Sequence, residues 1–302
     1  MALISVVTAT FNRAQVLRVT LESLRAQTFM EWELLVVGDA CTDDTADVVA
    51  SFGDARMRFV NLPENSGDQA APNNEGVRLG SSAYVAFLNH DDLWTPDHLA
   101  TSLAALQSAN ADLVFTMVLA LSADGAPLVE GVAPSGAYDG RTIAPASGWL
   151  LRRELAASVG PWRRAKETHA APSQDWIFRA WKKGHRLIAV PKPTVFALPS
   201  GTRKNSYTTA SGADEHARYA KLLREDPDFL ARLLAQVIVQ LRGELASPAR
   251  MARRSITSLL GRALTALHIQ PHAVSLALKY RRRGGLIDAL RRTRGLKPLA
   301  RK

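Results

Sequence analysis

The sequence predicts an α/β fold in which a mostly parallel, doubly wound sheet carries helices on both faces. Two observations support this fold class. Short apolar, β-branched runs alternate with helix-like segments through the first third of the 302-residue chain, as in parallel sheets with right-handed crossovers. From about residue 212 onward, the sequence shows only helical patterns. We therefore expect a sheet-containing domain over residues 1–211 and a helical extension over residues 212–302.

The first four strands and helices follow one another in a regular order. Each expected strand is an apolar run bounded by polar residues, and each expected helix carries apolar residues at helical spacing. Thr95 and Pro96 have the residue types of a helix N-cap and a first helical position. The expected strands are residues 3–8, 32–37, 58–62 and 84–88, and the helices that follow them are residues 14–27, 42–52, 68–79 and 96–109.

The rhythm changes after a further expected strand at residues 112–121. Residues 122–125 carry the signal of a hairpin turn, and residues 131–145 have the Gly, Pro and small-residue content of a loop. Ser173 is the expected cap of a helix that ends before Gly184. The last expected elements before the extension are two short strands at residues 186–190 and 194–198 and a polar loop at residues 200–211.

Composition restricts the class of protein. A chain with 47% hydrophobic and 22% charged residues is typical of a folded globular protein. The single cysteine, Cys41, excludes an intrachain disulfide and a cysteine-rich metal site. The N-terminus lacks the basic region of a signal peptide, and no stretch approaches the ~20 apolar residues of a membrane-spanning helix. These features predict a cytoplasmic protein.

The net charge of +10 is concentrated in the last part of the chain. Residues 243–302 carry 14 Lys or Arg and only two acidic residues, Glu244 and Asp288, a local net charge of +12. The basic residues interleave with apolar residues at helical spacing, which favours peripheral contact with the inner, anionic membrane surface. Oligomerisation or plain packing is the alternative. No base-reading motif is present, so we expect no nucleic-acid partner.

The most informative segment is Asn89-His90-Asp91-Asp92, which directly follows the expected strand at residues 84–88. In open α/β sheets, ligands bind at the carboxyl ends of the strands. Adjacent carboxylates repel each other, so such a pair usually needs a cation. Hard divalent cations held by few protein carboxylates take other ligands from phosphate oxygens. The segment therefore predicts that Asp91 and Asp92 bind a divalent cation next to a phosphate group.

Three segments, in this order, resemble glycosyltransferase family 2. They are SVVTATFNR at residues 5–13, LLVVGDACTDDT at residues 34–45 and FLNHDD at residues 87–92. They are similar to the family's first strand and loop, its nucleotide-binding turn and its metal-binding turn. The similarity covers roughly residues 3–200. The resemblance implies a GT-A fold, with a Rossmann-like sheet, and a nucleoside-diphosphate sugar as donor.

The resemblance also implies which residues hold the donor. The first loop and the turn after the second strand would bind the nucleoside, with Asp39 accepting a hydrogen bond from the base or ribose. A helix-capping role is the alternative for Asp39, and a simple helix start is the alternative for the loop at residues 64–76. A solvated position is the alternative for His90. The implied donor-binding residues are Thr8, Thr10, Asn12, Arg13, Asp39, Asn74, Asn89 and His90.

Asp175 matches the position of the family's catalytic base. It lies in the first turn of an expected helix, where the helix dipole favours the ionised carboxylate that a base needs. A surface ion pair with Arg179 is the alternative. Contacts to the diphosphate or the acceptor are expected for Trp149, Arg152, Trp176, Arg203 and Lys204. Core packing of the tryptophans and solvation of the loop that carries Arg203 and Lys204 are the alternatives.

The sequence thus predicts a metal-dependent, inverting glycosyltransferase that uses Mn²⁺ or Mg²⁺. It would transfer a sugar from a UDP-, dTDP- or GDP-sugar to a hydroxyl of a glycan or lipid-linked acceptor in surface polysaccharide synthesis. Gly38, Asn89 and Gln174 stand where the family usually has acidic residues. These departures motivate an alternative, a nucleotide-sugar-binding module with weakened chemistry. A nucleotidyltransferase shares the fold type, but no Gly-rich phosphate loop follows the first strand.

Overall fold

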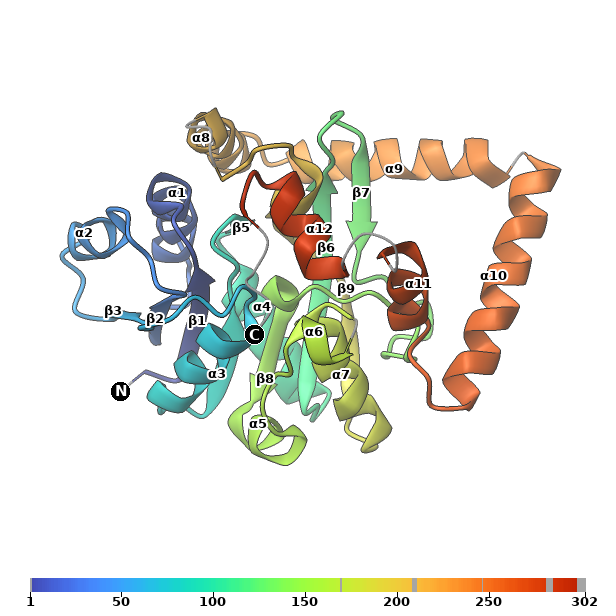
Figure 1. Cartoon of the computed structure of the whole chain (residues 1–302), viewed down its shortest axis with the longest axis horizontal. Helices are drawn as coiled ribbons and strands as arrows, with labels where there is room; N and C mark the ends of the chain where they lie inside the picture. The colour runs from blue at the N-terminus through green and yellow to red at the C-terminus, as the bar shows by residue number, and fades with distance from the viewer. Residues whose placement is uncertain (1, 169, 208–210, 246, 281–284, 298–302) are drawn as a thin grey trace.

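The computed structural model describes residues 2–168, 170–207, 211–245, 247–280 and 285–297 (Figure 1). Within these residues, nine strands form one sheet with the order β3-β2-β1-β4-β8-β6-β9-β5, and β7 pairs with β6. Helices cover both faces of this sheet. The predicted α/β class is confirmed.

The N-terminal half is the parallel part of the sheet. β1 pairs in parallel with β2 and β4, and β2 pairs in parallel with β3. The carboxyl ends of these strands therefore meet at one edge. The strands are β1 (Ile4–Thr10), β2 (Trp32–Gly38), β3 (Met57–Asn61) and β4 (Tyr84–Phe87), and the helices that follow are α1 (Ala14–Arg25), α2 (Thr45–Ala50), α3 (Ala70–Leu79) and α4 (His98–Ser108).

The other half of the sheet is mixed. β8 runs antiparallel to both β4 and β6. The sheet therefore changes from parallel to antiparallel pairing between β4 and β8. β6 and β7 form the expected hairpin. The strands are β5 (Asp92–Trp94), β6 (Leu113–Leu121), β7 (Pro127–Glu130), β8 (Trp149–Arg152) and β9 (Leu187–Ala197), and the short helices between them are η1 (Ala146–Gly148), α5 (Arg153–Val159), α6 (Ala165–Thr168), α7 (Pro172–Lys182) and η2 (Ser200–Thr202).

Four expected helix starts are wrong by up to three residues: α2 and α3 begin at Thr45 and Ala70 rather than at residues 42 and 68, and α4 and α7 also differ. α4 begins at His98 rather than Pro96, because residues 92–94 form β5 and the Thr95 amide continues its pairing by donating to the Thr194 carbonyl at 2.9 Å. α7 begins at Pro172 with Ala171 as its N-cap, so Ser173 lies inside the first turn. Proline fits the first helical position because its missing N–H needs no partner there.

The two short strands expected at residues 186–190 and 194–198 are one strand, β9. Its register against β6 slips between Val190 and Pro193, opposite Thr116 and Met117. Pro191 and Pro193 lack the amide hydrogens that a ladder uses, so the strand crosses this point irregularly instead of ending.

Within the described residues, the helical extension contains five helices, which take different paths (Figure 1). α8 packs against α1, and α9 crosses β6 and β7. α10 stands away from the sheet, α11 returns to it, and α12 lies over the loops at the carboxyl edge of the parallel strands. The helices are α8 (Ser211–Glu225), α9 (Phe229–Leu245), α10 (Pro248–Ala266), α11 (Pro271–Tyr280) and α12 (Leu286–Thr293).

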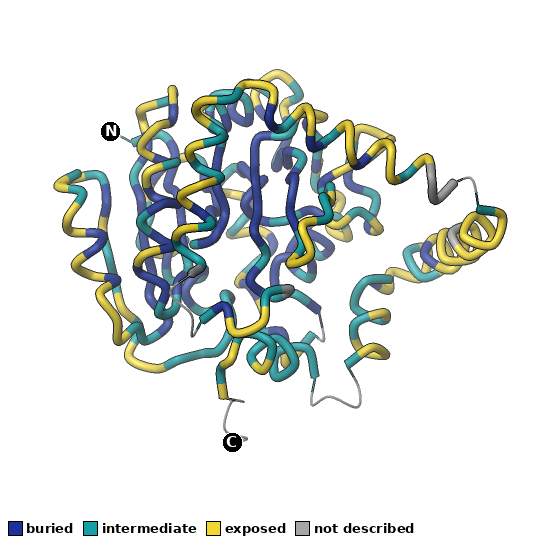
Figure 2. Tube along the Cα trace, turned by 90° about the horizontal axis from the view of Figure 1, so that it is seen from above, coloured by how far each residue is buried: buried dark blue, intermediate teal, exposed yellow. Residues whose placement is uncertain are grey.

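Burial differs sharply along this extension (Figure 2). One side of α9 is buried, with Phe229, Leu233 and Val237 each less than 10% exposed, whereas Leu259 and Leu260 of α10 are 64% and 60% exposed. Among the described helices, none is both long enough and apolar enough to cross a bilayer.

Candidate active site

The segment after β4 forms a tight turn that is held from within. The Asn89 amide donates to Ser147 Oγ at 3.0 Å, and Asn89 Nδ2 donates to Asp92 Oδ2 at 2.8 Å. Ser147 Oγ also donates to Asp92 Oδ2, at 2.5 Å. The Asp92 carboxylate is therefore tied to η1 and to its own turn, and this fixes the backbone of residues 89–92 at the edge of the sheet.

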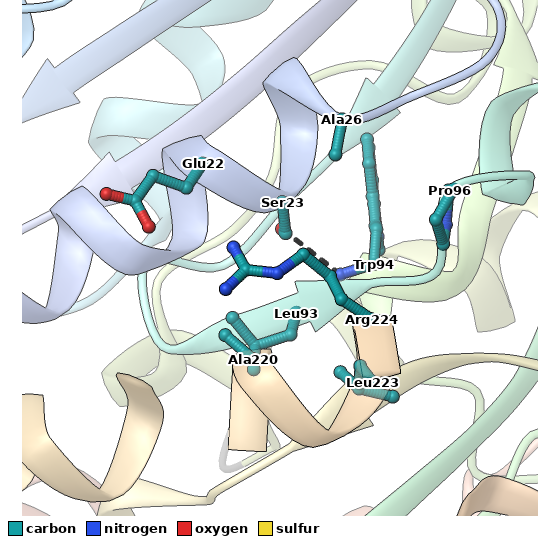
Figure 3. Close-up of a pocket in the computed structure, with 9 residues that line it drawn as sticks. All are labelled: Glu22, Ser23, Ala26, Leu93, Trp94, Pro96, Ala220, Leu223 and Arg224. Atoms are coloured by element: carbon teal, nitrogen blue, oxygen red, sulfur yellow. Dashed lines mark hydrogen bonds between the residues drawn. The ribbon is translucent and has the colours of Figure 1, made fainter. Parts of the chain in front are cut away.

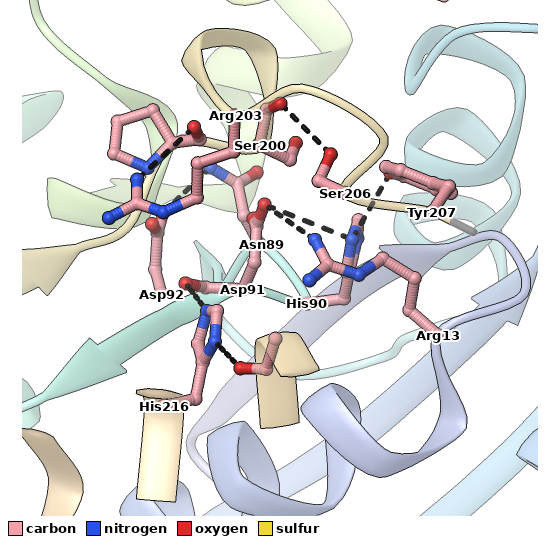
Figure 4. Close-up of polar contacts among 12 residues, drawn as sticks. Arg13, Asn89, His90, Asp91, Asp92, Ser200, Arg203, Ser206, Tyr207 and His216 are labelled. Atoms are coloured by element: carbon pink, nitrogen blue, oxygen red, sulfur yellow. Dashed lines mark hydrogen bonds and ion pairs between the residues drawn. The ribbon is translucent and has the colours of Figure 1, made fainter. Parts of the chain in front are cut away.

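Asp91 faces a different set of partners (Figure 4). Its Oδ2 lies 3.6 Å from Arg13 Nη1 and 3.9 Å from His90 Nε2, and the Arg13 side chain is only 4% exposed. Burial opposes ionisation of Asp91, but His90, when its ring is protonated, and Arg13 outweigh it and hold the pKa of this carboxyl below its usual range. Asp91 is thus an ionised carboxylate in a largely buried position.

Asp92 shifts in the opposite direction. Burial, and next the adjacent Asp91 carboxylate, raise the pKa of Asp92, while its bonds from Ser147 and Asn89 only partly offset this. Two neighbouring carboxyl groups with opposite shifts are a common feature of functional sites. The structure therefore separates their roles: Asp91 carries the charge, and Asp92 holds the turn.

His90 is neutral and has a defined tautomer. Burial lowers the pKa of His90 to about 4. Its Nδ1 lies 3.2 Å from the Ala9 carbonyl oxygen, which can only accept, so Nδ1 carries the hydrogen. Its Nε2, 3.2 Å from the Tyr207 hydroxyl, is then the acceptor. His90 links β1 to the loop after η2.

The expected nucleoside-binding residues gather at the carboxyl ends of β1 and β2. Asp39 accepts hydrogen bonds from the amides of Ser66 and Gly67 at 2.7 and 2.9 Å. Asn12 exchanges two hydrogen bonds with Thr42 and has a left-handed φ of 47°. These contacts join the two loops and residues 66–67 into one rim around this edge of the sheet.

The hydroxyls of Thr8 and Thr10 are buried and have no hydrogen-bond partner among the described residues. They lie on β1, directly before the rim. Asn74 lies elsewhere, because both atoms of its amide pair with the Trp162 backbone at 2.8–3.0 Å. The predicted donor contact of Asn74 is therefore replaced by a structural link between α3 and the loop before α6.

Three of the expected diphosphate or acceptor residues lie away from this edge. Trp149 and Trp176 are 0% and 1% exposed and pack with Trp162 in one aromatic cluster, so they form core rather than an acceptor pocket. Arg152 pairs with Tyr84, at the beginning of β4, because β8 is antiparallel to it. Its side chain bonds to the Ala111 carbonyl and to Asn110 at the opposite end of the sheet.

The loop after β9 also differs from expectation. The Arg203 guanidinium binds Glu215 through two hydrogen bonds of 2.9–3.0 Å and reaches the Leu121 carbonyl, so it anchors α8 instead of a diphosphate. Lys204 is exposed. Asp175 lies in the first turn of α7, and its Oδ2 accepts from Arg179 Nε at 2.9 Å, the ion pair that the sequence offered as the alternative.

Sequence reasoning missed several residues that complete the site. His216 of α8 lies 3.1 Å from the Asp91 carbonyl oxygen, and Tyr207 contacts His90. Arg294, at the end of α12, has its guanidinium carbon 5.3 Å from the centre of the Tyr207 ring. No local motif marks these residues, because they reach the turn only through the path of the helical extension.

A separate pocket lies between α1, β5 and α8 (Figure 3). Its lining includes the apolar residues Leu93, Trp94, Ala220 and Leu223 and the charged residues Glu22 and Arg224. This pocket lies beside β5, which follows the turn at residues 89–92. Neither Asp91 nor Asp92, whose pKa values shift in opposite directions, lines it. The two carboxyl groups with opposed pKa shifts therefore lie at the turn at residues 89–92 and not in this pocket.

Among the described residues, no three His, Cys, Asp or Glu side chains form a complete metal cage. The turn offers one ionised carboxylate, Asp91, facing the edge of the sheet. This donor set fits a hard divalent cation that takes most of its ligands from phosphate and water. It does not fit a structural metal site, which needs a closed set of protein ligands.

Comparisons with known proteins show what this chain is similar to. Residues 5–129 match the model of the family described as Glycosyl transferase family 2. TuaG of Bacillus subtilis, named as a glycosyltransferase of teichuronic acid biosynthesis, is 34% identical over 128 residues, which cover 42% of this chain and 50% of TuaG. The chain spans about half the length of the curated relatives it matches.

Solved structures share the fold across nearly the whole chain. TarS of S. aureus in complex with UDP-GlcNAc has a TM-score of 0.58 at 19% identity, covering 98% of this chain and 91% of that one. The mannosyltransferase PcManGT from Pyrobaculum calidifontis, in complex with GDP-Man and Mn²⁺, has a TM-score of 0.55 at 16% identity, covering 92% and 87%. Residues 5–129 are therefore similar to glycosyltransferase family 2, and the chain as a whole has a GT-A fold.

Proposed function

We propose that this chain transfers a sugar from a nucleoside-diphosphate sugar to a hydroxyl of a glycan or lipid-linked acceptor, in the synthesis of a surface polysaccharide. The observation that carries this proposal is the ionised, largely buried Asp91 at the carboxyl edge of the parallel strands, beside the rim formed by Asp39 and Asn12. Neighbouring structures hold UDP-GlcNAc or GDP-Man, and TuaG is named for teichuronic acid biosynthesis. Both facts support the proposal.

Donor binding is assigned to the ends of β1 and β2. The orphaned hydroxyls of Thr8 and Thr10 are donors that a ligand or water at this edge would satisfy. Asp39 and Asn12 shape the rim that would hold the nucleoside, and Arg13 brings a positive charge to its inner side. UDP, dTDP and GDP are the candidate nucleotides.

Asp91 is the proposed ligand of Mn²⁺ or Mg²⁺, and Asp92 is the neighbour that fixes its position. When bound, such a cation would offset the negative charge that develops on the leaving nucleoside diphosphate. The protein's part is to keep Asp91 ionised through Arg13 and to hold the turn through Asn89, Asp92 and Ser147.

Asp175 is the proposed general base of an inverting transfer, which would take the proton of the acceptor hydroxyl. It lies in the first turn of α7. The pair with Arg179 must loosen for this role. Asp175→Asn should lower turnover by about 100-fold or more with little change in donor affinity. Normal turnover in this variant would mean that Asp175 only forms a structural ion pair with Arg179. Asp175→Asn and Arg179→Gln should then lower the free energy of unfolding to the same extent.

The proposal is tested by a thermal-shift screen of UDP-, dTDP- and GDP-sugars with Mn²⁺ or EDTA, followed by an assay of sugar transfer or donor hydrolysis. Binding to the native state raises the melting temperature. We expect one donor class to do so, more strongly with Mn²⁺, and to be turned over. Binding without turnover would favour the alternative of a binding module, and no shift with any donor would contradict the proposal.

We also propose that α10 contacts an anionic membrane surface. Met251, Ile256, Leu259 and Leu260 are each 49–64% exposed on this helix. Arg250, Arg253 and Arg262 lie on the same helix, so apolar and basic side chains are presented together. The protein should float with liposomes that contain phosphatidylglycerol, and Leu259→Asn/Leu260→Asn should reduce flotation. Equal flotation of both proteins would contradict the proposal.

A further inference from the structure

We propose that α12 covers the donor site and that Arg291 and Arg294 bind the diphosphate of the donor. This inference rests on the proposed function and assigns a binding role to a part of the chain that lies about 200 residues after the turn at residues 89–92. It replaces Arg203 and Lys204 as the basic residues of that subsite. Four observations support it.

The end of α12 is fastened to the loop that carries Tyr207. The Tyr207 amide donates to the Arg294 carbonyl at 3.1 Å, and the Asn205 amide donates to the Thr293 carbonyl at 2.7 Å. Gly201 in η2 approaches Leu290 of the same helix. α12 is therefore docked on this loop by its backbone and by an apolar contact, at a place where the loop also reaches His90.

Arg294 points its charge at the turn at residues 89–92. Its guanidinium carbon lies 5.3 Å from the Tyr207 ring centre, and that of Arg13 lies 5.1 Å from the same centre. The positive charge of Arg294 acts on both His90 and Asp91. Its Nε is buried and has no hydrogen-bond partner among the described residues. A buried donor of this kind is costly unless a ligand or water satisfies it.

Arg291 lies one turn earlier on α12 and faces the nucleoside side. Its Nη1 lies 3.5 Å from Asn65 Oδ1, and its charge interacts with Asp39. Asn65 in turn donates to the Asp39 carbonyl at 2.8 Å. Residues three apart share a helix face, so Arg291 and Arg294 together extend from the rim around Asp39 to the turn around Asp91.

Side chains that can bind phosphate gather at this place. Arg13, Arg291 and Arg294 bring three guanidinium groups, whereas the carboxylates they act on are Asp91 and Asp39, with Asp288 beside Arg291. Asp39 is already held by two backbone amides. Arginine binds phosphate through a planar fork of N–H donors. A nucleoside diphosphate held by Arg291 and Arg294 would satisfy the orphaned Arg294 Nε.

The test measures the binding of inorganic pyrophosphate, UDP and UMP to the full-length protein by calorimetry, in Mg²⁺ and in EDTA. Arg294→Gln and Arg291→Gln are compared with Arg292→Gln, which changes an exposed arginine of the same helix. We expect Arg294→Gln to weaken pyrophosphate binding roughly tenfold or more. The preference for UDP over UMP should shrink in the same variant, and Arg292→Gln should stay within about twofold of the parent protein.

The inference is overturned if pyrophosphate does not bind, or if it binds equally to the parent, Arg294→Gln and Arg292→Gln proteins. Arg294→Lys guards against a folding effect, because it keeps the charge and loses the fork; it should bind pyrophosphate more tightly than Arg294→Gln and more weakly than the parent. A failure of the proposed function has a different signature: pyrophosphate binding would still depend on Arg294, but no nucleotide sugar would be turned over.

Discussion

α10 and α12 belong to the same basic extension, yet they meet different surroundings. Both combine arginines with apolar residues at helical spacing. α12 lies on loops that carry Tyr207, Asn65 and the turn at residues 89–92, and its arginines act on buried groups. α10 stands away from the sheet, and its Leu259 and Leu260 remain exposed (Figures 1 and 2).

The contrast shows that a basic amphipathic pattern does not by itself select a role. The pattern provides apolar area and positive charge, and the fold decides what meets them. α12 brings Arg291 and Arg294 to the edge of a parallel sheet, where we propose that they bind an anionic ligand. α10 presents both properties to the outside, where a lipid surface is the natural complement. Three predictions sharpen this contrast.

The largest effect is expected beneath α12. Asp91→Asn removes the ionised carboxylate that faces Arg13 and should lower turnover of the donor roughly 1,000-fold, about 4 kcal/mol of activation free energy. Asp228→Asn, at an exposed carboxylate before α9, is the matched control and should leave turnover within about twofold. Turnover of Asp91→Asn within tenfold of the parent would remove this carboxylate from the reaction.

A smaller effect separates the buried side of α9 from the exposed side of α10. Leu233 is 7% exposed against the cluster that contains Phe196 and Leu119, whereas Leu260 is 60% exposed. Leu233→Ala should lower the free energy of unfolding by about 2–4 kcal/mol, and Leu260→Ala by less than about 0.5 kcal/mol. Urea unfolding measures both. Similar losses at the two positions would mean that α10 is buried in solution.

The smallest expected effect is a dependence of stability on pH. The buried His98 should cause it, and the side chains of α10 should not. His98 is 0% exposed, its Nδ1 bonds to Thr194 Oγ1 at 2.7 Å, and burial lowers its pKa to about 3. The unfolded chain binds a proton here at pH values below about 6.5, whereas the folded chain does not. Stability from His98 is therefore complete above that pH and is lost as the pH falls.

Between pH 7.5 and pH 5, the loss from His98 should be about 2 kcal/mol. His98→Gln should remove that share of the pH dependence, as measured by urea unfolding at both pH values. The titratable side chains of α10 are arginines, which keep their charge over this range, so Arg253→Gln is the matched control. An unchanged pH dependence in His98→Gln would show that His98 is not buried as a neutral group.

Much of the parallel half of the fold could be predicted from the sequence. The strands at residues 4–10 and 32–38 and the turn at residues 89–92 lie where apolar runs and polar turns alternate. Their order alone places the carboxyl ends together, because parallel strands joined by helices share one edge. The sequence alone therefore predicts that Asp39, Asn12 and Asp91 lie in one region.

The mixed half was less predictable. Trp149 and Arg152 lie at the two ends of an apolar strand, β8, whose direction the sequence could not predict, and its antiparallel pairing with β4 brings Arg152 to the opposite end of the sheet. The same limit applies to Arg203, whose partner Glu215 comes from a helix of the extension. Charge and residue type identify candidates for contact, but strand direction decides which of them reach the site.

By itself, the sequence determined the alternating strands and helices, the acidic turn at residues 89–92 and the concentration of basic residues near the end of the chain. These depend on local patterns of apolar, polar and charged side chains. Only the tertiary structure decided that Arg294 and Tyr207 lie at the turn while Leu260 lies exposed on α10. Long-range packing sets such contacts, and its free energy comes from surfaces that meet only after the chain has folded.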